Sequence, residues 1–369
     1  MNFNTGKIVE YSRKIVYTTT LEVSTMSPSN RSTVLSLVLS TLLVSGSLRA
    51  QAPQAPLGPI PEAWTQAFKQ VRFDPPPPSL TRNSHYWVSN EERQDLFREP
   101  ILNKGGILIG LGTDQVYLFA GWARPEIVVP LDFDQAVVDL HAAYRVFFLA
   151  SPTPEDLLRW FDTRKEKEAL KLLEGSFSDD KERQAVMKAY TLGRKFIRNR
   201  LNRVKNSYGR INIPTFLTDQ AQYDFIVNLI KTGRVFPVRG DLTQASTVRD
   251  VAQAAKVTGL PVRVLYLSNA EQYFDYLPDF VQNMMSLPFD GQSVVIRTLG
   301  MKTAWAPDGL YEYISQSGEN FRLWLQSPRT KSVWKMTPFR TVDKKTGASV
   351  IDVPPPPPPP PKDEKPKKK

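Results

Sequence analysis

Apolar and polar positions in the middle of the chain follow two alternating patterns, short buried runs and longer stripes at helical spacing. The buried runs predict five strands, at residues 105–112, 126–134, 235–241, 262–269 and 293–299. The helical stripes between them cover residues 114–122, 134–150 and 247–261. Strands that alternate with helices predict an α/β fold with a mostly parallel sheet and helices on both faces. Residues 310–326 alternate on both sides of Ser317-Gly318 and predict a C-terminal antiparallel hairpin.

A long helical and charged segment separates the second predicted strand from the third. It spans about residues 151–215, begins with a proline after Thr153, and predicts a helical insertion in the sheet domain. Ser89 and Glu92 have the spacing of a capping box, which predicts a further helix after them. The whole α/β domain is expected to span residues 85–342.

Both flanks of this domain are rich in proline. Residues 51–84 predict an extended linker around one short helix near residues 64–71. Residues 343–369 predict a disordered tail, in which eight consecutive prolines form a stiff rod that holds lysines away from the domain. The lysine tip either contacts anionic envelope polymers or lipid headgroups, or is a tail without a partner.

The first fifty residues contain the parts of a secretory signal peptide. A short basic stretch after Met26 precedes the apolar run 34–44, and the small residue Ala50 lies at the expected cleavage position. Met26 is therefore a candidate for the true start, and the protein is predicted to be exported to the periplasm or secreted. The apolar run is too short to span a membrane, so an integral membrane protein is not expected. The alternative is a cytosolic protein that keeps this run as an N-terminal helix.

The net charge of +11 is concentrated at the two ends of the chain. Residues 1–50 hold five Lys or Arg and two acids, residues 354–369 hold five Lys and two acids, and +5 remains for the middle. Because no nucleic-acid-binding module is recognisable either, no nucleic-acid partner is predicted. The absence of cysteine excludes thiolate catalysis, disulfides and cysteine zinc sites. Two histidines are too few for a multi-histidine site, and no set of acids has a known ligand spacing, so no metal site is predicted.

A Gly-x-Gly turn follows the first predicted strand, in the stretch IGLGTDQ that contains Gly110 and Gly112. Such a turn lets the backbone approach a ligand, and an acid at the end of the next strand can accept hydrogen bonds from ribose hydroxyls. Asp132 lies twenty residues after Gly112, close to the spacing that such a pocket needs. The ends of the third and fourth strands add four side chains at the same edge of the sheet: Asp241, Asn269, Glu271 and Tyr273.

Each of these residues also has a purely structural interpretation. The glycines could form a strand-to-helix turn that needs positive φ, and Asp132 could cap the following helix together with Asp134. Asp241 could stabilise its own turn, and the residues from Asn269 to Tyr273 could start a helix. The spacing alone leaves both interpretations open.

The order of these motifs resembles a class I S-adenosylmethionine-dependent methyltransferase, from the glycine loop to the final hairpin. It is also similar to an uncharacterised family of exported bacterial proteins that share this Rossmann, methyltransferase-like fold. The resemblance covers about residues 105–326 and implies S-adenosylmethionine as the cofactor. It implies that Asp132 binds ribose and that Asp241 lies near the adenine amino group. It would bring Gly110 and Gly112 to the methionine part, and Thr113 and Asp114 of the same loop are further candidates for binding the cofactor.

Candidate catalytic residues follow from the same resemblance. It implies that Asn269 contacts the substrate. If the protein is a methyltransferase, Asn269 or Glu271 would hold the acceptor, with Glu271 as a candidate base, and Tyr273 is a further candidate for binding the substrate. His141 lies on the stripe of its predicted helix and is either a base near the site or a buried, hydrogen-bonded histidine. Asp114 stands where the third glycine is usual, and its carboxylate would oppose an anionic ligand group unless a cation offsets it.

A basic stretch supports a different kind of function. No acid occurs between Glu182 and Asp219, and Arg198 and Arg203 are candidates for contacts with an anionic envelope polymer or a protein. A solvated helix face, or pairing with the acids just before it, is the structural alternative. The sequence therefore leaves three functions open. These are an exported domain that binds a small ligand, with or without methyl transfer, a non-catalytic interaction protein with a degenerate methyltransferase fold, and a cytosolic methyltransferase.

Overall fold

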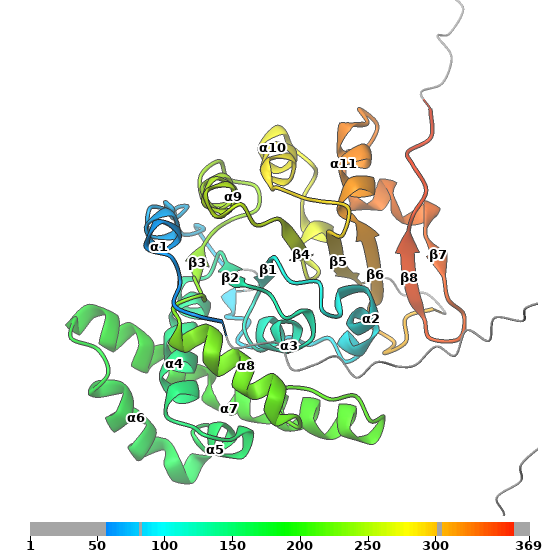
Figure 1. The fold of residues 1–369 in the computed structure, drawn as a ribbon. Helices are drawn as coiled ribbons and strands as arrows, with labels where there is room; N and C mark the ends of the chain where they lie inside the picture. The colour runs from blue at the N-terminus through cyan, green and yellow to red at the C-terminus, as the bar shows by residue number, and fades with distance from the viewer. Residues whose placement is uncertain (1–56, 81–82, 301–304, 358–369) are drawn as a thin grey trace, which may run out of the picture. The chain divides into compact units, whose positions relative to one another are not determined.

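The computed structural model describes residues 57–80, 83–300 and 305–357, and these contain an eight-stranded sheet (Figure 1). The strand order is β3-β2-β1-β4-β5-β6-β8-β7. In chain order the strands are β1 (Ile107–Leu111), β2 (Ile127–Asp132), β3 (Val238–Arg239), β4 (Val262–Tyr266), β5 (Val294–Leu299), β6 (Glu312–Ser317), β7 (Thr341–Val342) and β8 (Ala348–Ile351).

Strands β1 to β5 are parallel to one another, and the chain order reverses between β1 and β4. Strand β6 is antiparallel to β5, β8 is parallel to β6, and β7 forms an antiparallel hairpin with β8. The predicted α/β class, with a mostly parallel sheet and a C-terminal antiparallel hairpin, is confirmed. A reversal of strand order in such a sheet opens a crevice at the carboxyl ends of the strands, where ligands bind.

Helices cover both faces of the sheet (Figure 1). One face carries α1 (Glu62–Lys69), α9 (Thr247–Thr258), α10 (Pro278–Ser286) and α11 (Gly318–Gln326). The other carries α2 (Arg98–Ile101), α3 (Asp114–Ala123), α4 (Gln135–Leu149), α5 (Pro154–Arg159), α6 (Glu166–Glu174), α7 (Asp180–Arg210) and α8 (Gln220–Lys231). Successive strand residues point to opposite cores: Leu108 packs beneath α3, whereas Ile107 and Ile109 pack beneath α9.

The hairpin does not lie where the alternation of residues 310–326 predicted it. Ser317 ends β6 and caps α11, because its hydroxyl accepts a hydrogen bond from the Asn320 amide at 3.1 Å. Phe321, Trp324 and Leu325 then have helical spacing and are buried in the core. The predicted position of the hairpin was therefore wrong, because a short amphipathic helix and a strand share an apolar pattern over a few residues.

The predicted linker and tail both contribute to the folded unit. The Phe68 ring of α1 stacks on Phe236 with 4.4 Å between ring centroids. The buried Asp74 carboxylate accepts hydrogen bonds from the Ser246 and Thr247 amides at the start of α9. At the other end, β8 lies within the predicted tail and pairs with β6. The short helix predicted near residues 64–71 is present as α1. The predictions were wrong in that the linker packs on the domain and part of the tail is a strand, because proline excludes regular hydrogen bonding but does not prevent packing.

The capping box predicted at Ser89 is also absent. The Ser89 hydroxyl bonds within its own loop, to Glu91 and Gln94, and residues 94–97 form a 3-10 helix, η2 (Gln94–Phe97). The helical insertion is confirmed and extends beyond its predicted bounds, from α5 to α8. Among the helices of the described residues, none is long and apolar enough to cross a membrane. The signal-peptide prediction falls on residues 1–50, outside the described part of the chain.

Candidate functional site

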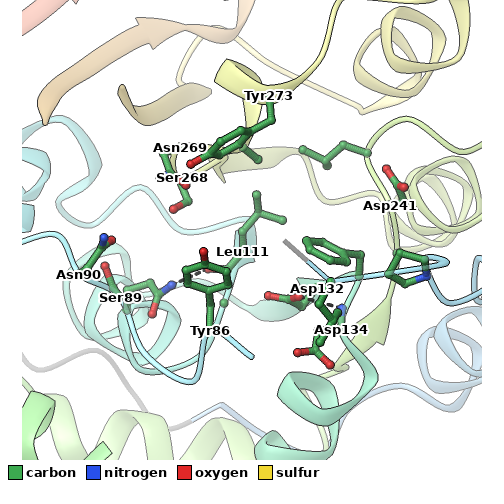
Figure 2. A pocket seen from close by; sticks show the side chains of 18 of the residues that line it. Tyr86, Ser89, Asn90, Leu111, Asp132, Asp134, Asp241, Ser268, Asn269 and Tyr273 are labelled. Carbon is green, nitrogen blue, oxygen red and sulfur yellow. Dashed lines mark hydrogen bonds between the residues drawn. The ribbon is translucent and has the colours of Figure 1, made fainter. Parts of the chain in front are cut away.

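A cavity of about 420 Å³ opens at the carboxyl ends of β1, β2, β3 and β4 (Figure 2). Five of the residues predicted from the sequence to bind a ligand line it: Gly112, Asp132, Asp241, Asn269 and Tyr273. They come from four separate loops of the chain, and the reversal of strand order between β1 and β4 brings these loops together. The predicted convergence of strand ends therefore exists in the folded protein.

Gly112 turns the chain from β1 into α3. Its φ of +85° lies in the left-handed region, and a side chain there would collide with Gln115. Gly110 is different, because it lies inside β1 and faces Val116 of α3, where an added Cβ would be only 3.1 Å from a methyl group. Gly110 does not line the cavity, so its prediction as a ligand contact was wrong. Its role is to let β1 and α3 pack closely.

Thr113 and Asp114 are buried and turn away from the cavity. The Thr113 hydroxyl donates to the Trp87 carbonyl at 2.6 Å. The Asp114 carboxylate is 3.0 Å from the Arg200 guanidinium, and the two residues are 2% and 1% exposed. The expected conflict between this carboxylate and a ligand is therefore absent, since a cation of the helical insertion neutralises it. Both residues support the loop and do not contact a ligand.

Asp132 ends β2 and lines the cavity with a half-buried carboxyl group. Burial is the main cause that raises its pKa from 3.8 to about 7, and the neighbouring charge of Asp134 contributes. The Asp134 amide donates to the Asp132 carboxylate at 2.9 Å. Asp134 itself caps α4 by accepting from the Ala136 amide, and its second oxygen contacts His85 Nδ1 at 2.6 Å. A half-buried acid with a raised pKa in a cavity is a typical functional group.

We expect Asp132→Asn to stabilise the protein more at pH 8 than at pH 4. The folded carboxyl keeps its proton up to about pH 7, whereas the unfolded one loses it near pH 4. Stability therefore falls as the pH rises through this window, and asparagine removes the effect, which is on the order of 4 kcal/mol. Urea unfolding at both pH values measures it. The exposed Asp224→Asn is the control, and an equal gain at both pH values would contradict the assignment.

Asp241 supports its own turn and also lines the cavity. One carboxylate oxygen accepts from the Thr243 amide at 2.8 Å and from the Thr243 hydroxyl at 2.7 Å. Its backbone amide donates to Asp74, so the segment before the predicted domain fixes the position of this loop. The structural and the functional interpretation of Asp241 therefore both apply.

The turn after β4 forms a polar wall that sequence reasoning recognised only in part. Ser268 has a φ of +50°, which a residue other than glycine rarely adopts and which often marks a functional turn. The side-chain amides of Asn269 and Asn90 donate to the Tyr311 hydroxyl at 3.3 and 2.8 Å. Tyr311 and Asn90 had no signal in the sequence, because they reach the cavity from positions far from every strand end of the parallel sheet.

Glu271 and His141 do not reach this cavity, which corrects their prediction as catalytic bases. Glu271 is buried against Arg297 at 2.6 Å and hydrogen-bonds to Tyr276. The His141 ring forms two hydrogen bonds, one between Nδ1 and the Tyr117 hydroxyl and one between Nε2 and the Gly112 carbonyl at 3.0 Å. Burial lowers the His141 pKa to about 4, so the ring stays neutral at ordinary pH. His141 is therefore a buried, hydrogen-bonded histidine, which was the structural alternative in the sequence analysis.

The cavity is acidic and has aromatic side chains on its rim. Of the described residues that line it, none is Lys or Arg, whereas three are aspartates. Tyr86 and Tyr273 lie on opposite sides in Figure 2 and are 48% and 63% exposed. Gln115 also lines it, with a buried side-chain oxygen that has no hydrogen-bond partner among the described residues. This lining favours a cationic or neutral ligand with hydrogen-bond donors.

A protein-family model matches residues 86–352 of the chain, and its description is "Domain of unknown function (DUF7790)". The chain belongs to this family. The match begins at Tyr86 of the cavity rim and includes the whole sheet and the helical insertion. Helix α1 and Asp74 lie before the matched part of this DUF7790 protein. No curated protein matches the chain.

The two arginines predicted to bind an anionic partner are both paired within the DUF7790 domain. Arg198 lies 3.5 Å from Asp162, and Arg203 lies 3.1 Å from Glu92. The predicted pairing with the acids just before the basic stretch is therefore present for Arg198, and Arg194 does the same with Glu166. Across the described ranges, no group of three His, Cys, Asp or Glu could hold a metal ion.

Proposed function

We propose that the cavity binds a small nucleoside-like or amino-acid-like molecule without phosphate groups. The convergence of Gly112, Asp132, Asp241 and Asn269 on one cavity at the reversal of strand order carries this proposal. Among the described residues, the side chains that line the cavity supply carboxylates and no Lys or Arg, which disfavours phosphate and favours hydroxyl, amino and cationic groups.

S-adenosylmethionine fits this pattern, and we propose methyl transfer as the activity to test. Its sulfonium and ammonium groups are cations that the acidic lining would stabilise. Asp132 would accept from the ribose hydroxyls, and the acceptor would lie against Asn269 and Tyr311. Because Glu271 is sealed in the core, the protein would act mainly by holding donor and acceptor in line, without a base at that position.

Calorimetry of the full chain with S-adenosylmethionine, S-adenosylhomocysteine and adenosine tests the proposal. We expect a micromolar dissociation constant, on the order of −8 kcal/mol, for at least one of them. Asp132→Ala should weaken this binding at least tenfold, because it removes the group that accepts from the ribose. The matched control is Asp224→Ala on the exposed side of α8, which should leave the constant unchanged.

Two results separate the parts of the proposal. Binding of adenosine alone would keep the nucleoside site and remove the methyl donor. The absence of heat with all three compounds, from a protein shown to be folded, would overturn the nucleoside-like ligand. Export from the cytoplasm stays a separate prediction, which sequencing of the mature N-terminus decides.

A further inference from the structure

A second cavity of about 420 Å³ lies on the far side of His141 from the Gly112 turn. Its walls come from α4, from the first turns of α7, and from the segment between Ile230 and Pro237. None of the described residues that line it also lines the first cavity. Its size is in the range of pockets that hold small molecules.

The floor of this cavity is apolar and electrically neutral. Val138, Val186 and Ile230 contribute aliphatic surface. His141 and Tyr117 add ring surface, and their polar atoms bind each other: since Nε2 donates to the Gly112 carbonyl, Nδ1 accepts from the Tyr117 hydroxyl at 2.8 Å. Any charge that a ligand meets must therefore come from the rim.

The rim carries two acids and one arginine that form no ion pair within the described residues. These are Asp139 of α4, Glu182 of α7 and Arg145 of α4. Among the described residues, the Asp139 carboxylate accepts a hydrogen bond from the Gln135 side-chain amide, at 2.7 Å. Burial raises its pKa, and the charges of Asp134 and Glu182 add to this effect while Arg239 opposes it. A cation held between Asp139 and Glu182 would relieve their repulsion.

The negative charge of Asp139 and the positive charge of Arg145 lie at different positions along α4. Asp139 and Arg145 are six residues apart, which corresponds to about 9 Å along the helix axis. Ala142 lies between them and lines the cavity, so the path from one charge to the other is apolar. The Arg145 guanidinium lies 5.8 Å from the centroid of the Phe177 ring, which restricts its orientation.

We propose that the second cavity binds a short apolar peptide with free ends, of about three residues. Its ammonium would lie between Asp139 and Glu182, its carboxylate would contact Arg145, and its side chains would cover Val138 and Val186. The ends of an extended tripeptide are roughly 10 Å apart, which matches the spacing of the rim charges. This site is independent of the ligand proposed for the first cavity.

Calorimetry of the full chain with the tripeptide Leu-Ala-Leu tests this site. The unmodified peptide should bind, and N-acetylation or C-terminal amidation should each weaken binding at least tenfold. Asp139→Asn should weaken the unmodified peptide while leaving the acetylated one unaffected. Arg145→Gln should weaken binding of the unmodified peptide and leave binding of the amidated peptide unaffected. Each variant removes one partner of a charge pair, and the corresponding modified peptide lacks the other partner.

Two controls keep the result specific. Arg159→Gln, an exposed arginine on α5, should leave binding of the unmodified peptide unchanged. Asp132→Ala should also leave it unchanged, because that residue lines only the first cavity. The proposal is overturned if Leu-Ala-Leu does not bind, or if the acetylated and amidated peptides bind as tightly as the free one. Since the variants change exposed or half-exposed side chains, thermal unfolding should show that they fold.

Discussion

Arg200→Met is expected to destabilise the protein by about 3–5 kcal/mol, because it leaves a buried carboxylate without its cation. Besides its ion pair with Asp114, the guanidinium donates to the Glu91 carbonyl at 2.8 Å and to the Gln94 side-chain oxygen at 2.7 Å. One side chain of the helical insertion therefore holds the loop that supplies Ser89 and Asn90 to the first cavity. The variant should lose ligand binding along with stability.

Urea unfolding measures this loss, and Arg198→Met is the matched control. Arg198 lies two residues away on the same helix, and its side chain is 44% exposed beside Asp162. Its replacement should cost less than about 1 kcal/mol, as is usual for exposed ion pairs. The double variant Arg200→Met with Asp114→Asn should recover part of the loss, because it removes the uncompensated charge. Equal effects of the two single variants would refute this role of Arg200.

Glu271→Ala is the second substitution with a large expected effect, again about 3–5 kcal/mol of stability. Arg297 is fully buried, and the Glu271 carboxylate neutralises its charge, with 2.6 Å between Arg297 Nε and Glu271 Oε2. Removal of that acid leaves an uncompensated guanidinium beneath the turn after β4. The expected consequence is a loss of folding and not a selective loss of activity.

The double variant Glu271→Gln with Arg297→Met separates a structural role from a catalytic one. With the charge pair replaced by uncharged side chains of similar size, most of the stability should return. Binding in the first cavity should return with it. Urea unfolding and calorimetry on the same samples provide both measurements, with the exposed Glu168→Ala as a control. A stable Glu271→Ala protein with a specific loss of methyl transfer would restore Glu271 as a base.

The local pattern of the chain was enough to predict the parallel part of the sheet. Buried runs such as residues 126–134 end in acids, and the helices between them have clear apolar stripes. The carboxyl ends of parallel strands share one edge, so Asp132, Asp241 and Asn269 could be placed together before their side chains were seen. Short elements with a mixed pattern, such as residues 318–326, could not be assigned, because few residues separate the two periods.

The chain by itself determined the fold class, the glycine turn and the acids that meet at the first cavity, because these follow from local periodicity and strand direction. Only the tertiary structure decided which charged side chains face a ligand and which face each other. Asp114 and Glu271 have the same chemistry as Asp132, but Arg200 and Arg297 arrive from distant segments and neutralise them in the core. The second cavity likewise forms where α4, α7 and the segment between Ile230 and Pro237 pack together. Burial and pairing depend on contacts between residues far apart in the chain, and a linear pattern does not contain them.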